Sequence, residues 1–146
     1  METTIFEPRE LGIQESKRPL FKQLTEDKFS PFYGRPLKEV FMCAFALGYK
    51  RSKKEEVIKR KADIRFESLS EQQKWILISV AIKAMGDITL LTEEEKQRRI
   101  WEIAEQYANG GIKLLHDIVY QSGYEGLGTK LLEDELRGEL KTLEKK

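Results

Sequence analysis

Apolar residues recur at helical spacing through the second half of the chain, in steps of four, three, four, three and four from Ile100 to Ile118. This spacing places the side chains along one face of an α-helix, where they need partners to cover them. The phase continues without interruption across Gly110 and Gly111. We therefore predict one long helix, with the two glycines at a point where another helix crosses closely.

The limits of this helix are indicated by its flanking residues. Thr92 and Glu95 form a capping box, in which each side chain satisfies a free backbone N–H, and the helix is expected to end near Gly123. The alternative is a break at Asn109-Gly110, because this pair is typical of a helix C-terminus and two adjacent glycines cost about 2 kcal/mol of helix propensity. The continuous apolar phase favours the unbroken helix.

Two more helices are predicted earlier in the chain. Ser70 and Gln73 form a second capping box, the apolar run WILISVAIKAM follows it, and Gly86 provides a left-handed stop. Because this run is apolar on nearly all sides, we expect it to be the central helix of the core. A helix from Pro36 to Gly48 is predicted by its leading proline and its broad apolar face.

A last helix is predicted from Lys130 towards the C-terminus, because leucines recur along one stripe of it. Such a stripe packs either on the core or on a partner protein. The predicted partner-binding residues are Leu132, Leu136, Leu140 and Leu143.

Together these helices predict an all-α fold, a compact bundle of four to five helices with an N-terminal extended arm. The 146 residues, of which 40% are hydrophobic, suffice for one core. We expect residues 1–18 to be a flexible or extended arm, because they are polar and aperiodic, and residues 19–146 to be a single helical domain. The sequence shows neither a signal-peptide pattern nor an apolar run of membrane-spanning length, so the expected location is the cytoplasm.

Positive charge is concentrated in one segment, from Lys50 to Arg65, although the whole chain carries only +1. Eight cations and three acids give this segment +5 and leave −4 for all other residues. Because clustered cations neutralise phosphates and release counterions, the segment predicts sequence-independent binding of DNA. The alternative is a solvated loop between helices, since ordinary surfaces are also charged. The predicted nucleic-acid-binding residues are Lys50, Arg51, Lys53, Lys54, Lys59, Arg60, Lys61 and Arg65.

An aromatic loop precedes the helix that starts at Pro36. It contains Phe29, Phe32 and Tyr33 between prolines and a glycine. We expect these rings to clamp the loop to the core, and any ring that stays exposed to assist in contacting nucleic acid.

The sequence contains no recognisable catalytic or metal-binding constellation. His116 is the only histidine, and Cys43 lies in an apolar run where a thiolate would be poorly solvated, so we expect a structural cysteine. The acids Asp63 and Glu67 form a pair without any further signature, and neither a P-loop nor a nucleophile elbow is present. We therefore expect no catalytic residue, no metal and no cofactor.

Three short blocks, EVFMCAFALGYKRSKK, GDITLL followed by EEEK, and EQYANGGIKLL, resemble a family of small proteins called dnd system-associated. The resemblance extends roughly from Lys38 to Leu115, and its most distinctive block contains the motif Ala108, Asn109, Gly110 and Gly111. Proteins of this family accompany DNA phosphorothioation systems. The resemblance therefore implies service beside machinery that replaces a nonbridging phosphate oxygen with sulfur, or beside restriction of DNA that lacks this mark. It implies no catalytic residue and no role for the motif.

Charge and resemblance together predict a non-enzymatic accessory protein of a phage-defence system that modifies and restricts DNA. The basic segment would bind DNA. The alternative is a protein–protein adaptor, or a homo-oligomeric structural component, of the same system. The expected partners are accordingly DNA, other proteins of the system or a second copy of the chain, and no membrane.

Overall fold

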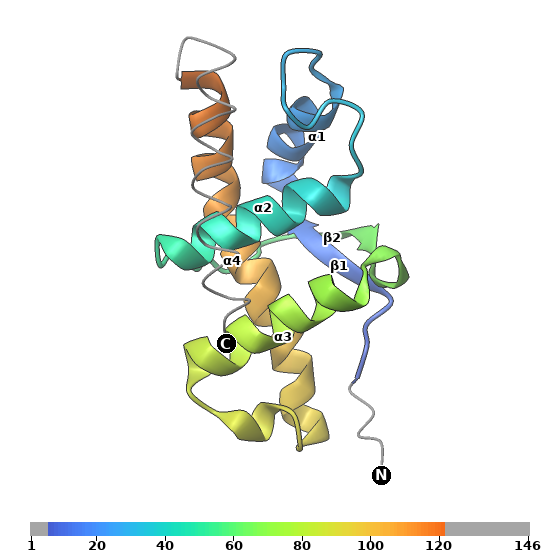
Figure 1. Cartoon of the computed structure of the whole chain (residues 1–146), viewed down its shortest axis with the longest axis vertical. Coiled ribbons are helices and arrows are strands. Elements are labelled where there is room, and N and C mark those ends of the chain that lie inside the picture. The colour runs from blue at the N-terminus through green and yellow to red at the C-terminus, as the bar shows by residue number, and fades with distance from the viewer. Residues whose placement is uncertain (1–5, 122–146) are drawn as a thin grey trace.

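The computed structural model describes residues 6–121 of the chain, and within them it is mostly helical with one small sheet (Figure 1). Short 3-10 turns, at Glu15–Lys17, Phe66–Ser68 and Ile88–Leu90, join some of the elements. The leucines predicted to bind a partner lie outside the described residues. The elements are β1 (Glu10–Gln14), α1 (Arg18–Glu26), α2 (Leu37–Lys50), β2 (Arg60–Arg65), α3 (Glu71–Met85) and α4 (Glu94–Gln121).

Helix α4 is the central element of the described fold. It runs unbroken for 28 residues along the long axis of the molecule, and α2 and α3 cross it (Figure 1). This confirms the prediction of one continuous helix through Gly110 and Gly111. The expectation that α3 is the central helix is wrong. Its Trp75 side chain is 51% exposed, because only one side of α3 is covered by α4.

Helices α2 and α4 approach closely through two glycines. A Cβ atom added to Gly48 would lie 1.9 Å from the carbonyl oxygen of Tyr107, and one added to Gly111 would lie 1.8 Å from that of Ala44. The predicted close crossing is therefore present at Gly111. The predicted end of α2 at Gly48 is wrong, because the helix continues to Lys50 and this glycine serves packing instead.

The predicted limits of α3 are confirmed. The Ser70 hydroxyl accepts a hydrogen bond from the backbone N–H of Gln73, and the Gln73 side chain accepts one from the backbone N–H of Ser70. At the other end, Gly86 adopts a left-handed conformation with φ of 63°. A residue without Cβ enters that region at little cost, so the helix stops there.

The purely all-α prediction needs a correction, because β1 and β2 form an antiparallel two-stranded sheet. Leu11 pairs with Ile64, and both side chains are buried together with Ile13. Each strand is too short to show an alternating pattern that stands out from its neighbours. The division into an arm of residues 1–18 and one domain of residues 19–146 stays a prediction, although β1 within that arm contributes to the core.

The described helices include none that is both long enough and apolar enough to span a bilayer.

Candidate nucleic-acid interface

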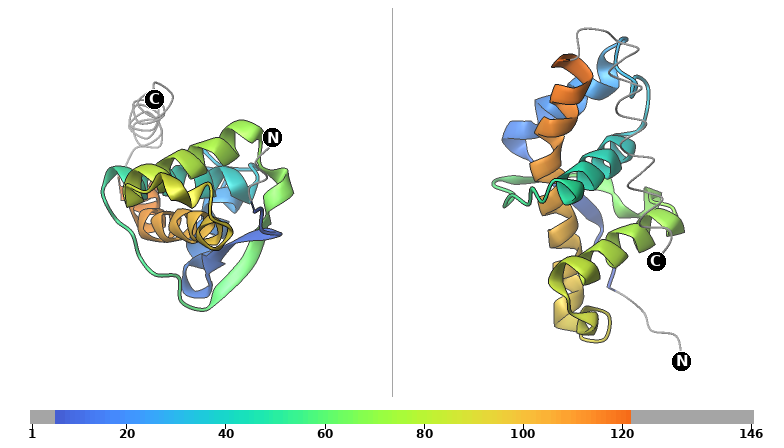
Figure 2. Two further views of the ribbon diagram at one scale, coloured as in Figure 1. Left: turned by 90° about the horizontal axis from the view of Figure 1, so that it is seen from below. Right: turned by 60° about the vertical axis from the view of Figure 1, so that its left-hand side comes forward.

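The predicted basic segment joins α2 to β2. Residues 51–59, called the basic loop from here on, pass around the outside of α4 before the chain enters the sheet (Figure 2). Lys50 ends α2, and β2 carries the last three predicted cations, Arg60, Lys61 and Arg65. Most side chains of the basic loop are exposed.

Backbone hydrogen bonds fix the basic loop to the two helices beneath it. The N–H of Lys53 donates to the carbonyl oxygen of Gly48 on α2 over 2.7 Å. The N–H of Glu55 donates to the carbonyl oxygen of Gln106 on α4 over 3.1 Å. Because these bonds involve backbone groups, they set the course of the loop without using its side chains.

Asn109 holds the next part of the basic loop from below. Its buried amide nitrogen lies 3.3 Å from the carbonyl oxygen of Glu55, 3.0 Å from that of Glu56 and 3.1 Å from the side-chain oxygen of Gln14. The same Gln14 oxygen accepts a hydrogen bond from the N–H of Ile58. One buried amide on α4 therefore ties the basic loop to β1 as well.

Gly110, the neighbour of Asn109, lets the loop lie directly on the helix. A Cβ atom at Gly110 would be 2.0 Å from the carbonyl oxygen of Lys53. Within the Ala108 to Gly111 motif, Asn109 and Gly110 contact the basic loop, whereas Gly111 allows the close approach of α2.

An acid of the basic loop is engaged within the protein. The Glu55 carboxylate pairs with the Lys17 ammonium at 2.5 Å, and the same ammonium donates to the backbone carbonyl of Asn109. This pairing compensates the negative charge of Glu55, although its side chain remains 53% exposed.

The structure divides the eight predicted cations into groups. Lys53, Lys54 and Lys59 are exposed, and no ion pair of theirs is found in the part of the chain that the structure describes. Among residues 6–121, the ion pairs of Lys61 and Arg65 are loose and exposed, at 3.9 Å to Glu15 and 3.6 Å to Glu67 respectively. Lys50 and Arg51 are exposed as well, and each takes part in another interaction of the chain.

Arg60 differs from the other predicted cations, because its guanidinium is held by the buried carboxylate of Glu105. The hydrogen bonds to Glu105 raise the pKa of Arg60 above its ordinary value, although partial burial opposes this. The position of Arg60 is therefore set by the core of the protein rather than by solvent.

The three rings of the aromatic loop also differ in their exposure. Phe32 is buried and anchors the loop, whereas Phe29 is 65% exposed and Tyr33 is 55% exposed. Sequence reasoning named the three rings but overlooked the cations of the same loop, Lys28 and Arg35. The sequence offered a signal for this positive charge, because no acid lies between the two cations.

The groups considered for catalysis make structural contacts. Burial, with a smaller effect of Glu39, raises the pKa of the Cys43 thiol to about 12, which disfavours a nucleophilic thiolate. Asp63 pairs with Arg18 at 2.7 Å, and a ring nitrogen of His116 lies 2.7 Å from the side-chain oxygen of Gln23. Within residues 6–121, no three side chains of the metal-binding types gather into a potential metal site.

These features define a small, mainly helical protein whose distinctive surface is a basic loop seated on its central helix. A family model described as DNA sulphur modification system-associated protein 4 matches residues 12–131. The chain therefore belongs to this family and is an accessory protein of a DNA sulphur modification system, as its sequence blocks indicated. The match extends beyond those blocks on both sides, to β1 at one end. No curated protein and no solved structure matches the chain.

Proposed function

We propose that this protein is a non-enzymatic, cytoplasmic accessory factor of DNA phosphorothioation modification and restriction, and that it binds DNA through the basic loop. The observation that carries the proposal is the state of Lys53, Lys54 and Lys59. Their side chains are exposed on a loop whose backbone is fixed by Gly48, Gln106 and Asn109.

A fixed loop suits binding to phosphate groups. Ordering a flexible loop on binding costs free energy. Hydrogen bonds to α2 and α4 already order this loop in the folded protein, so binding does not have to order it. Each lysine that contacts a phosphate releases about one counterion from duplex DNA. Three such contacts predict a slope of about −2.7 for the logarithm of affinity against the logarithm of salt concentration.

The test is fluorescence anisotropy with a labelled 20-base-pair duplex between 50 and 200 mM salt. With that slope, affinity falls roughly fortyfold over this range. The triple variant Lys53→Ala/Lys54→Ala/Lys59→Asn should lose most of the binding and most of the salt dependence. Asparagine is used at position 59 because Lys59 has a positive φ of 54°, which asparagine tolerates.

A pair of charge reversals provides the matched control. Lys54→Glu and Lys83→Glu change the net charge equally, and both lysines are exposed, but Lys83 lies on α3 and is not part of the basic loop. Only Lys54→Glu should weaken duplex binding substantially. No binding by the wild type at 50 mM salt, or equal losses from the two reversals, would contradict the proposal.

A second candidate is an adaptor that docks on another protein of the same system. It is supported by large apolar side chains exposed on and after α3, namely Trp75, Met85 and Ile88. Solvent-exposed rings and aliphatic chains of this size are common at protein interfaces. Pull-down with purified proteins of the system tests it, and Trp75→Glu should abolish a capture that depends on this surface.

A further inference from the structure

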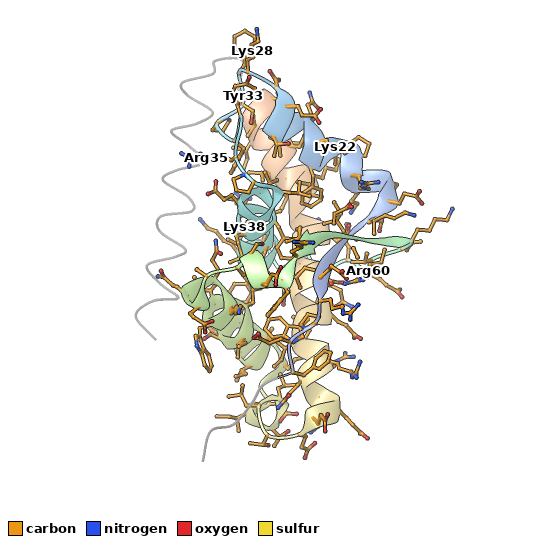
Figure 3. The ribbon with its side chains drawn as sticks, turned by 90° about the vertical axis from the view of Figure 1, so that its right-hand side faces the viewer. Lys22, Lys28, Tyr33, Arg35, Lys38 and Arg60 are labelled. Atoms are coloured by element: carbon orange, nitrogen blue, oxygen red, sulfur yellow. The ribbon has the colours of Figure 1, made fainter. Side chains whose placement is uncertain are left out.

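A second positively charged surface lies at the loop between α1 and α2. Residues 28–38 contain three cations and no acid, and two aromatic rings of this stretch, Phe29 and Tyr33, are more than half exposed. Figure 3 shows Lys28, Tyr33, Arg35 and Lys38 along one side of the molecule, with Tyr33 and Arg35 carried by the loop itself. None of these residues belongs to the basic loop.

This loop has a fixed shape, because short-range hydrogen bonds run through it. The Asp27 carboxylate accepts from the N–H of Phe29 over 3.0 Å, and the buried Ser30 hydroxyl accepts from the N–H of Phe32 over 3.1 Å. The N–H of Gly34 donates to the carbonyl oxygen of Thr25 on α1. The side chain of Phe32 is buried in the core and holds the centre of the loop in place.

The other two rings of the loop, Phe29 and Tyr33, do not belong to the hydrophobic core. Phe32 alone supplies the anchor, whereas Phe29 and Tyr33 leave 65% and 55% of their surface in water. Rings held outward on a rigid loop lose little conformational freedom when a flat partner stacks on them. The bases of a single strand are such partners, because every base has a π-face available for stacking on aromatic side chains.

The cations of the loop are available to phosphates. No ion pair of Lys28 is found among the described residues, and Arg35 has one loose pair, at 3.8 Å to Glu39. Lys22 on α1 is also exposed and shows no ion pair within residues 6–121, but it lies on the other side of the view in Figure 3 and is not assigned to the surface. Lys38 instead donates to the backbone carbonyl of Ser68, so it is not assigned to the surface.

We propose that the loop carrying Lys28, Phe29, Tyr33 and Arg35 binds single-stranded DNA. Bases stack on the two rings, and the flanking phosphates contact the two cations. A duplex does not fit this role, because its bases are already stacked on each other inside the helix. The proposal rests on the proposed function only in taking the nucleic acid to be DNA, and it concerns a different surface.

The first test is fluorescence anisotropy with a labelled 15-nucleotide thymidine oligomer at low salt. The double variant Phe29→Ala/Tyr33→Ala should bind at least tenfold more weakly than the wild type. Phe29→Leu/Tyr33→Leu keeps apolar bulk but removes the flat rings, so it should be equally impaired. Phe29→Trp/Tyr33→Trp should retain binding. If the leucine variant binds as well as the wild type, stacking is not the mechanism and the proposal is overturned.

A second test locates the contact directly. An oligomer with 5-iodouracil substitutions crosslinks under light to aromatic side chains that stack on the base. After trypsin digestion the crosslink should map to residues 29–38, a single peptide because the Arg35-Pro36 bond resists cleavage. A crosslink confined to any other peptide overturns the proposal.

The two proposals fail in distinguishable ways. Phe29→Ala/Tyr33→Ala should leave duplex affinity within about twofold of the wild type, and the triple variant of the basic loop should retain stacking-dependent binding of the oligomer. If the wild type binds duplex but not the oligomer, the single-strand site is refuted and the basic loop stands. If it binds the oligomer but not duplex, the basic-loop proposal fails and the single-strand site is supported.

Discussion

Arg60 and Glu105 lie 45 residues apart in sequence and are joined by two parallel hydrogen bonds. The guanidinium Nε lies 2.8 Å from one carboxylate oxygen, and Nη2 lies 2.9 Å from the other. The second oxygen also accepts the backbone N–H of Gly12 over 2.8 Å. A Cβ atom at Gly12 would lie 2.3 Å from Nε of Arg60, so the guanidinium passes where a larger residue of β1 would stand. Glu105 therefore joins both strands to α4.

Glu105→Ala should lower the free energy of unfolding by about 1–3 kcal/mol, because it leaves the N–H of Gly12 and the guanidinium of Arg60 without their acceptor. Urea denaturation measures the change. Glu102→Ala provides the control, since Glu102 is exposed on the same helix one turn earlier. Equal stabilities for the two variants would show that the contact contributes nothing to the fold.

Gly111→Ala should destabilise the protein even though alanine favours helix formation by about 1 kcal/mol. The new methyl group would meet the carbonyl oxygen of Ala44 at 1.8 Å, which forces α2 and α4 apart. Overpacking of this kind costs about 1–3 kcal/mol. Thermal unfolding followed by circular dichroism measures it, with Ser79→Ala on the exposed side of α3 as the control. An unchanged melting temperature would contradict the close crossing.

Gly110→Ala should disturb the basic loop more than the helix crossing. Its methyl group would meet the carbonyl oxygen of Lys53 at 2.0 Å, so the loop has to lift away from α4. The hydrogen bond from the N–H of Glu55 to Gln106 should then open, and hydrogen exchange at Glu55 should accelerate. Mass spectrometry of peptides covering residues 51–59 detects this change, and exchange as slow as in the wild type would contradict the prediction.

Cys43 should react slowly with thiol reagents in the folded protein. Burial, followed by the charge of Glu39, raises the thiol pKa from 9.0 to about 12. At pH 8 this leaves about a thousandfold less thiolate than an unperturbed cysteine has. Because the folded state disfavours the thiolate, deprotonation of Cys43 lowers the free energy of unfolding only as pH rises above 9. Alkylation by iodoacetamide, with and without urea, measures the ratio, and rates within tenfold of each other would contradict the prediction.

The sequence contained enough local information to predict the helices. Helix signals come from residues that are close in sequence, so they can be recognised without the structure. Examples are the capping box of Ser70 and Gln73, the left-handed Gly86 and the apolar spacing that continues through Gly111. Gly48 was misinterpreted for a related reason. A glycine near the end of an apolar run has the same appearance whether it stops a helix or admits a neighbouring one, and only the position of Tyr107 distinguishes the two roles.

The sheet and the seating of the basic loop depend on distant pairings that the sequence does not display. Arg65 pairs with Glu10 in the sheet, and the Asn109 amide reaches Gln14 across 95 residues. Net charge located the basic segment, but it counts every cation equally. It could not separate Arg60, which is committed to Glu105, from Lys54, which is exposed, because Glu105 resembles any other acid of a surface helix until the fold buries it.

The order of synthesis gives the attachment of the basic loop to Asn109 a further consequence. Glu55 is made 54 residues before Asn109, and a ribosome needs about 3–11 s to add that stretch. During this interval the lysines of a growing chain belong to a segment that can bond to α2 but lacks Asn109 and the surface of α4. The basic loop therefore acquires its final shape only after α4 has been synthesised.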